Sequence, residues 1–235
     1  MTIEFNSSVD IDAATAEYAV DKRARIFNVL DLETAGDLTM YIHGNVPFEA
    51  AYVLNGEFKS SGLDELRAMP KAQLDGIMQQ IHADAGKGVG FYYGRHKVDP
   101  KPIADNKVQE AFEFLNAPAT LDAIKKISGF DDIVAASAQV TRYHPGNFLT
   151  RHNDINANEE RRVAYVLNLT PDWHPDWGGL LQFYQADGTP RDAWAPMFNS
   201  LALFDVNHVH AVTYVAPYAT KPRFSITGWF RAKPL

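Results

Sequence analysis

The spacing of apolar positions divides the chain near residue 138. Before that point apolar residues recur at helical intervals, and short alternating runs lie between the helical segments. The pattern predicts helices over 31–43, 70–85, 108–117 and 120–129, and strands over 25–30, 48–55 and 88–98. Asp31 is expected to cap the first of these helices, and Pro70 to begin the second. Residues 1–23 are compatible with either a short helix or a loose arm.

After residue 138 the pattern becomes a series of short strands separated by Pro, Gly, Asn and Asp. Such a series is typical of an antiparallel barrel or a two-sheet jelly roll. The expected strands are 138–143, 148–154, 162–169, 180–184, 200–206, 210–215 and 223–230. No long linker divides the chain, so the sequence predicts one α+β catalytic domain over 1–235. In it, about 1–137 form a mostly helical support with a few strands, and about 138–235 form the jelly-roll core.

Composition narrows the functional class. The 235 residues are 46% hydrophobic and 22% charged, as in an ordinary soluble globular protein. A net charge of −7 argues against a nucleic-acid surface. The absence of cysteine excludes disulfides and thiolate ligands and fits a reducing compartment. With no apolar run that could span a membrane and no basic leader, the expectation is a cytoplasmic protein without membrane partners.

Candidate metal ligands lie in the strand-rich part. His152 and Asp154 are two residues apart in a run that reads as a strand, so both side chains would point to one face. One imidazole, one carboxylate and a second imidazole suit iron(II) and leave coordination positions open. The second imidazole is expected from His208 or His210, which share the same strand parity and cannot be separated by it.

Several motifs occur in an order that resembles a known family. Tyr143 opens a Y-x-x-G segment, which is followed by the HxD pair, a W-x-x-x-x-G-G-x-L turn from Trp173, an H-x-V at His210 and a basic residue at 223. From Tyr143 to Phe230 the chain thus resembles the iron(II)- and 2-oxoglutarate-dependent dioxygenases, in their prolyl 4-hydroxylase-like branch. The resemblance implies a double-stranded β-helix core.

The resemblance also implies roles for individual residues. His152, Asp154 and His210 would hold iron(II), which selects His210 over His208. Arg223 would bind the distal carboxylate of 2-oxoglutarate, since an arginine fork meets a carboxylate bidentately. Ser225 shares its strand face and could add a hydroxyl bond.

Two further residues are candidates for cosubstrate contacts. Tyr143 matches a tyrosine that often lines the cosubstrate pocket, although a core tyrosine is an equal alternative. Asn168 stands where many relatives have a tyrosine that contacts the cosubstrate, and its shorter side chain puts that contact in doubt. Trp173 and Trp177 are expected at the rim or in packing, and Arg161 and Arg162 to face water.

The reaction implied by the resemblance is hydroxylation of a substrate C–H, with O2 consumed and succinate and CO2 released. The implied substrate is a prolyl residue in a protein or peptide, and a small molecule is the alternative. Ascorbate is expected as a supporting reductant. A rival interpretation is a cupin-like metal protein that binds a sugar or isomerises it without 2-oxoglutarate. A third is a non-catalytic binding module, which the intact ligand set disfavours.

One segment of the N-terminal half is a candidate for substrate recognition. Residues 91–106 combine an aromatic strand with a proline-bearing loop, and loops at a scaffold rim commonly carry recognition. Tyr92, Tyr93 or Arg95 would then contact substrate. An ordinary strand packed outside the barrel is the alternative.

Overall fold

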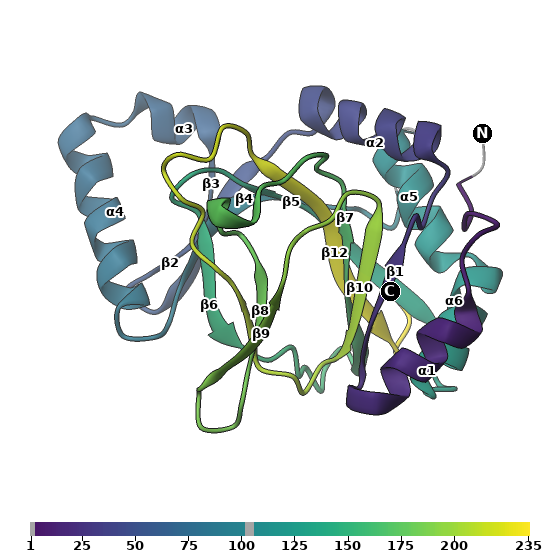
Figure 1. Ribbon diagram of the computed structural model, residues 1–235. Coiled ribbons are helices and arrows are strands. Elements are labelled where there is room, and N and C mark those ends of the chain that lie inside the picture. Colours follow the sequence, from purple (N-terminus) through teal and green to yellow (C-terminus); the bar gives the residue numbers. More distant parts are fainter. Residues whose placement is uncertain (1–2, 102–105) are drawn as a thin grey trace.

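A computed structural model describes residues 3–101 and 106–235 (Figure 1). The helices are α1 (Ile11–Asp21), α2 (Leu32–Asn45), α3 (Leu63–Ala68), α4 (Lys71–Ala85), α5 (Lys107–Asn116), α6 (Pro118–Ser128) and the 3-10 turn η1 (Pro175–Trp177). The strands of the N-terminal half are β1 (Arg23–Phe27), β2 (Glu49–Leu54), β3 (Glu57–Gly62) and β4 (Phe91–Lys97). Those of the C-terminal half are β5 (Ala135–Tyr143), β6 (Phe148–His152), β7 (Arg161–Asn168), β8 (Leu181–Tyr184), β9 (Pro190–Trp194), β10 (Ser200–Asp205), β11 (His210–Val212) and β12 (Arg223–Arg231).

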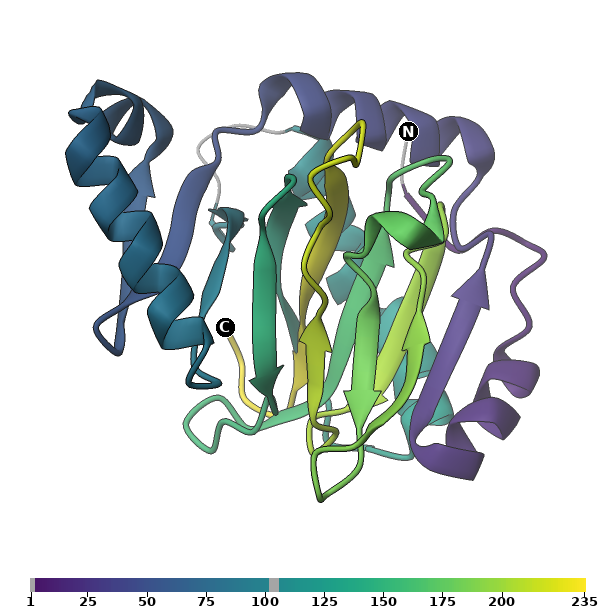
Figure 2. The same ribbon diagram turned by 60° about the vertical axis from the view of Figure 1, so that its left-hand side comes forward.

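The strands form one strongly curled antiparallel sheet, in the order β1-β10-β7-β12-β5-β4-β6-β11-β8-β9. β2 pairs with β4 and carries β3 at its free edge. In Figure 2 the sheet curls so that β6, β11, β8 and β9 face the longer strands across an interior. This is the jelly-roll architecture that the strand pattern predicts.

Alternation along the strands explains how two different faces are buried. On β7, Val163, Tyr165 and Leu167 belong to the cluster packed under the helices, whereas Ala164 and Val166 belong to a second cluster inside the curl. Helices α1, α2, α5 and α6 cover the outer face, and their apolar side chains complete the first cluster. The inner face is therefore free to carry polar residues of a site.

The helix predictions are confirmed with small changes. Asp31 caps α2 by accepting from the backbone N–H of Glu33 at 2.7 Å, an interaction that contributes about 1 kcal/mol. Leu32, the first residue of α2, is 72% exposed and takes no part in the buried face of this helix. Residues 11–21 form a helix, which decides between the helix and the loose arm.

One strand prediction needs correction, and two strands were not predicted. The prediction for 48–55 placed alternate residues on one buried face, but β2 is buried on both, since Ala51 and Val53 are as enclosed as Ala50 and Tyr52. β2 lies between α4 on one side and the interior of the curl on the other. β3 and β9 were not predicted, because most of their side chains are exposed and show no apolar alternation.

The N-terminal half contributes more than support. β1 pairs with β10, and β4 lies between β5 and β6, so strands of both halves share one sheet. The assignment of 1–235 to a single catalytic domain stays a prediction. No helix in the described part of the chain is long and apolar enough to cross a membrane.

Candidate active site

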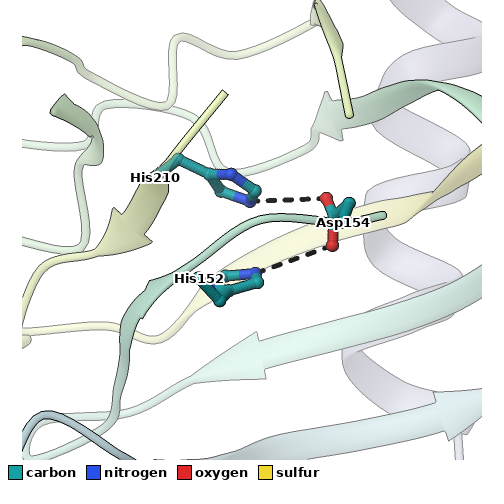
Figure 3. A group of neighbouring side chains, drawn as sticks. All are labelled: His152, Asp154 and His210. Carbon is teal, nitrogen blue, oxygen red and sulfur yellow. Dashed lines mark ion pairs between the residues drawn. The ribbon is translucent and has the colours of Figure 1, made fainter. Parts of the chain in front are cut away.

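Three potential metal ligands converge at one end of the curl. His152 is the last residue of β6 and His210 the first of β11, and the two are paired across these antiparallel strands. Asp154 follows two residues after β6 ends, where its backbone N–H donates to the carbonyl of Val206 at 3.0 Å. One ligand atom from each side chain lies within 4.8 Å of the other two. Figure 3 shows both imidazoles directed at the two carboxylate oxygens of Asp154.

The hydrogen bonds of the two imidazoles leave a lone pair of each for a cation. His152 Nδ1 lies 2.9 Å from the carbonyl of Thr150, and His210 Nδ1 lies 2.9 Å from that of His208. A carbonyl only accepts, so each Nδ1 carries a proton, and each ring directs its Nε2 at the carboxylate. The Nε2 to oxygen distances are 3.7 Å for His152 and 3.4 Å for His210.

Lone pairs facing a carboxylate repel it unless a cation lies between them. Burial, and after it the nearby His152, lowers the pKa of His210 to about 4, so this ring is neutral at pH 7. Two imidazoles and one carboxylate are the donor set that non-haem iron(II) takes with positions left open. The residues present therefore fit an iron(II) ion.

The alternative histidine lies elsewhere. His208 Nε2 is 2.8 Å from the backbone carbonyl of Asp21, at the end of α1. The structure thus brings His210, and not His208, to the cluster. The parity argument was incomplete, because β6 ends at His152 and Asp154 reaches the same face through the loop that follows.

Arg223 provides a buried cation on the inner face of the curl. It is the first residue of β12 and only 2% exposed. Its Nη1 donates to the carbonyl of Gly179, and its Nη2 donates to Asn168 Oδ1 at 3.2 Å. Its Nε has no partner, and no carboxylate of the described residues forms an ion pair with it. Burial lowers its pKa to about 10, which leaves the group charged at neutral pH.

An unpaired buried guanidinium is costly, and an anionic ligand would relieve the cost. Ser225 and Asn168 lie beside it, and Ser225 Oγ donates to Asn168 Oδ1 at 3.3 Å. The ring of Tyr143 lies 5.6 Å from the guanidinium carbon. Burial raises the pKa of Tyr143, so its hydroxyl stays neutral. The sequence-predicted residues at 143, 168, 223 and 225 are thus brought together.

One cavity joins the two groups. It is lined by His152, Asp154, His210, Arg223 and Tyr143. It also reaches residues that sequence reasoning missed, which are Gln139, Thr141, Thr227 and Trp229. These lie at alternate positions of β5 and β12, the strands that carry Tyr143 and Arg223. Extending the alternation from those two residues would have found them.

The candidate recognition segment, residues 91–106, begins with β4, and its two tyrosines lie on opposite faces of this strand. Tyr93 lines the cavity and stacks on Tyr143 at 5.0 Å between ring centroids. Tyr92 packs in a different cluster, on the side of α4. Arg95 is close enough to bond the Tyr93 hydroxyl. Residues 102–105 of this segment, with Pro102, lie outside the described residues.

The tryptophans and glycines near 173–179 form one turn under Arg223. Trp173 is buried and donates from Nε1 to the carbonyl of Gly178 at 2.9 Å, which fits the packing role expected for it. Gly178 and Gly179 have φ values of +70° and +63°, as a glycine turn requires. The carbonyl of Gly179 is then presented to the guanidinium.

The expectation that Arg161 and Arg162 face water holds for Arg162, which pairs with Asp132 at the exposed surface, but not for Arg161, whose side chain is only 15% exposed. The Arg161 guanidinium lies 3.4 Å from the centroid of the Trp229 ring and bonds Glu159. Arg162 forms a bidentate pair with Asp132. The periodic pattern could not show these partners, because Asp132 and Trp229 are far away in sequence.

Comparisons with known proteins agree with this geometry. Residues 138–231 match the family model of the 2OG-Fe(II) oxygenase superfamily. The mouse prolyl 3-hydroxylase OGFOD1 is 34% identical over 114 residues, which are 46% of this chain and 20% of the mouse protein. The chain thus matches only a fifth of the length of that relative.

Solved structures resemble the whole fold. A prolyl-4-hydroxylase from Pseudomonas putida superposes with a TM-score of 0.65 at 19% identity, covering 96% of this chain and 100% of that one. A Trichoplax adhaerens prolyl hydroxylase, solved with a peptide fragment of the hypoxia inducible factor oxygen degradation domain, has a TM-score of 0.60 at 15% identity, covering 94% and 89%. Residues 138–231 thus match the 2OG-Fe(II) oxygenase model, and the chain as a whole has the fold of the solved prolyl hydroxylases.

Proposed function

We propose that this protein is an iron(II)- and 2-oxoglutarate-dependent dioxygenase that hydroxylates a prolyl residue in a protein or peptide. The observation that carries the proposal is a single cavity with two different features. At one end it has two imidazoles and a carboxylate, and within it lies a buried arginine without a carboxylate partner. The first suits a metal with open positions, and the second suits the free end of a dicarboxylate.

In this proposal His152, Asp154 and His210 hold the iron. Bound iron(II) would supply the chemistry that couples O2 and 2-oxoglutarate to hydroxylation, giving succinate, CO2 and one oxygen atom on the substrate carbon. The carbonyls of Thr150 and His208 fix the ring orientation of the two histidines through Nδ1, which keeps each Nε2 available.

Arg223 would bind the distal carboxylate of 2-oxoglutarate through the guanidinium edge that has no partner. Asn168 and Gly179 hold the rest of the guanidinium in place through their oxygens. The hydroxyl groups of Ser225 and Tyr143 are neutral donors beside Arg223 that could complete the carboxylate site. In this scheme Asn168 positions the arginine and does not itself contact 2-oxoglutarate. It would thus differ from the tyrosine that many relatives have at this position.

The substrate would enter beside Trp229 and Tyr93. Both line the cavity, and the Arg161 guanidinium covers the Trp229 ring while its Nη1 donates to the carbonyl of Asp154 at 3.4 Å. An aromatic wall next to the metal ligands suits the flat, apolar ring of a prolyl residue. The assignment to proline draws on the relatives, which are named as prolyl 3- and 4-hydroxylases.

Two experiments test the proposal. The purified chain with iron(II), ascorbate and 2-oxoglutarate should release succinate, and release should rise when a prolyl peptide that it hydroxylates is added. Mass spectrometry of the peptide should show one added oxygen, and amino-acid analysis should assign it to C3 or C4. No succinate under any of these conditions would refute the oxygenase function.

Arg223 separates the oxygenase from the cupin-like rival, which needs no carboxylate fork. Arg223→Ala should weaken 2-oxoglutarate binding at least about tenfold, because a secluded charge-assisted pair is lost. Metal binding should stay, since Arg223 contacts none of the three ligands. Unchanged dependence on 2-oxoglutarate in this variant would favour the cupin-like function. We further propose a cytoplasmic location, supported by the absence of cysteine.

A further inference from the structure

A second cavity, of about 750 Å³, lies on the opposite side of β4 and β5 from the active site. It is bordered by the segment that follows α2, the start of β2, α3 and β4. Alternation on β5 separates the two cavities, because Tyr143 lines the first and Arg142 lines the second. The second cavity is of a size usual for small ligands and plays no part in the function proposed above.

Arg142 is the central group of this cavity. Its guanidinium lies 4.3 Å from the centroid of the Phe48 ring, which holds it flat against the strands. Its Nε is buried without a partner, and no described carboxylate forms an ion pair with it. Gly94 makes this position possible, since a Cβ there would lie 3.2 Å from both the Cβ and the Nε of Arg142.

A second arginine lies near Arg142. Arg67 of α3 lines the same cavity, as does His96 of β4. Arg95 and Lys97 also border the cavity, but they pair with Thr141 and Gln139, so their side chains project toward the active-site face of β4. Burial, and after it the proximity of Arg67, lowers the pKa of Arg142, so the two guanidinium groups repel each other. Like charges held together in a partly buried cavity are costly unless an anion neutralises them.

The two carboxylates in the lining are already engaged. Asp64 pairs with Arg67 at 3.0 Å on the exposed side of α3. Glu49 Oε2 accepts from Ser60 Oγ at 2.5 Å. Neither carboxylate therefore pairs with Arg142, which is left as an unpaired cation in a chain whose net charge is −7.

We propose that this cavity is a binding site for the phosphate group of a small phosphorylated ligand. The two guanidinium groups of Arg142 and Arg67 match a doubly charged, tetrahedral oxyanion better than a single carboxylate, because arginine forks bind two oxygens each. The cavity is larger than a phosphate ion, so the remainder of the ligand would occupy the part bordered by Phe48 and Pro47.

Inorganic phosphate is the first probe, and the protein is kept at constant ionic strength with chloride. Amide chemical shifts followed by NMR should show saturable changes at Gly94, Arg142 and His96. A mononucleotide should compete at the same amides and bind more tightly if the body of the ligand also contributes. Changes confined to residues around Arg223 would instead place the anion in the active site and overturn the proposal.

Variants make the test specific. Arg67 is exposed, so Arg67→Glu should fold normally and weaken phosphate binding at least about tenfold. Arg142→Gln should have the same effect. Lys87→Glu, at the exposed end of α4 and outside the cavity, makes the same charge change as Arg67→Glu and should leave binding intact. Equal phosphate affinity in all three variants, or no saturable response in the parent protein, would also refute the site.

Discussion

The side-chain oxygen of Asn168 accepts a hydrogen bond from the buried guanidinium of Arg223 at 3.2 Å, from the neighbouring strand. β7 and β12 pair so that Asn168 lies opposite Ser225, which brings all three side chains together. A neutral oxygen at this place orients the arginine without neutralising it. The charge of Arg223 thus remains available for a ligand carboxylate.

This relationship predicts the effect of a single-atom change. Asn168→Asp keeps the shape of the side chain but places an anion beside Arg223, so the guanidinium would be neutralised from within the protein. We expect 2-oxoglutarate to bind at least about tenfold more weakly, while the free energy of unfolding without ligand is unchanged or rises. Calorimetric titration with 2-oxoglutarate and thermal unfolding measure the two quantities.

Ser200→Ala is the matched control for that variant. Asn168 Nδ2 lies 3.2 Å from Ser200 Oγ, and the aspartate would lose this donor as well as gain a charge. Ser200→Ala removes the same hydrogen bond with no new charge, so it should retain 2-oxoglutarate affinity. Equal loss in the two variants would mean that the hydrogen-bond network matters and the charge does not.

Metal binding should depend on Asp154 and not on His208. Asp154→Ala removes the only carboxylate of the cluster, so we expect iron(II) or manganese(II) binding and succinate formation to be lost. His208→Ala should keep both, because its ring bonds the carbonyl of Asp21 outside the cluster. Metal titrations of the two variants check this. If the His208 variant loses metal binding, His208 must be counted among the metal ligands.

Part of this site could be predicted from sequence, because side-chain types and strand parity are local properties. Parity predicted a shared face for His152 and Asp154 but could not choose between His208 and His210. That choice depends on the pairing of β11 with β6 and on the turn before β11, where the His208 ring meets the carbonyl of Asp21 at the end of α1. Contacts between distant segments of this kind have no signal in a single sequence.

Contacts between distant segments also explain why the sequence left other side chains unplaced. Tyr92 and Tyr93 were equal candidates, since the sequence does not say which face of β4 meets the interior. Pairing of β4 with β5 and β6 decides it in favour of Tyr93. Likewise, Arg161 reads as a solvated residue until β12 brings Trp229 beneath it.

The turn below Arg223 should tolerate no side chain at Gly178. Its φ is +70° and its ψ −145°, and an added Cβ would lie 2.1 Å from the carbonyl oxygen of Tyr214. Gly178→Ala should therefore lower the free energy of unfolding by at least about 2 kcal/mol. Gly36→Ala, in the open middle of α2, should instead raise it by about 0.5–1 kcal/mol. Denaturant unfolding compares them, and similar effects in both would contradict the strain argument.

Tyr93 should affect the prolyl substrate and not the cosubstrate. Its ring stacks on Tyr143, and its hydroxyl lies near Gln139, Arg95 and Asp154, on the side of the metal ligands. Tyr93→Phe keeps the stack and removes the hydroxyl, so KM for a prolyl peptide should rise several-fold while KM for 2-oxoglutarate stays constant. Tyr92→Phe, on the α4 side of the same strand, should change neither. Steady-state kinetics with each substrate varied in turn measures both constants. If KM for 2-oxoglutarate rises instead, the Tyr93 hydroxyl belongs to the cosubstrate site, and substrate recognition lies on the Trp229 wall alone.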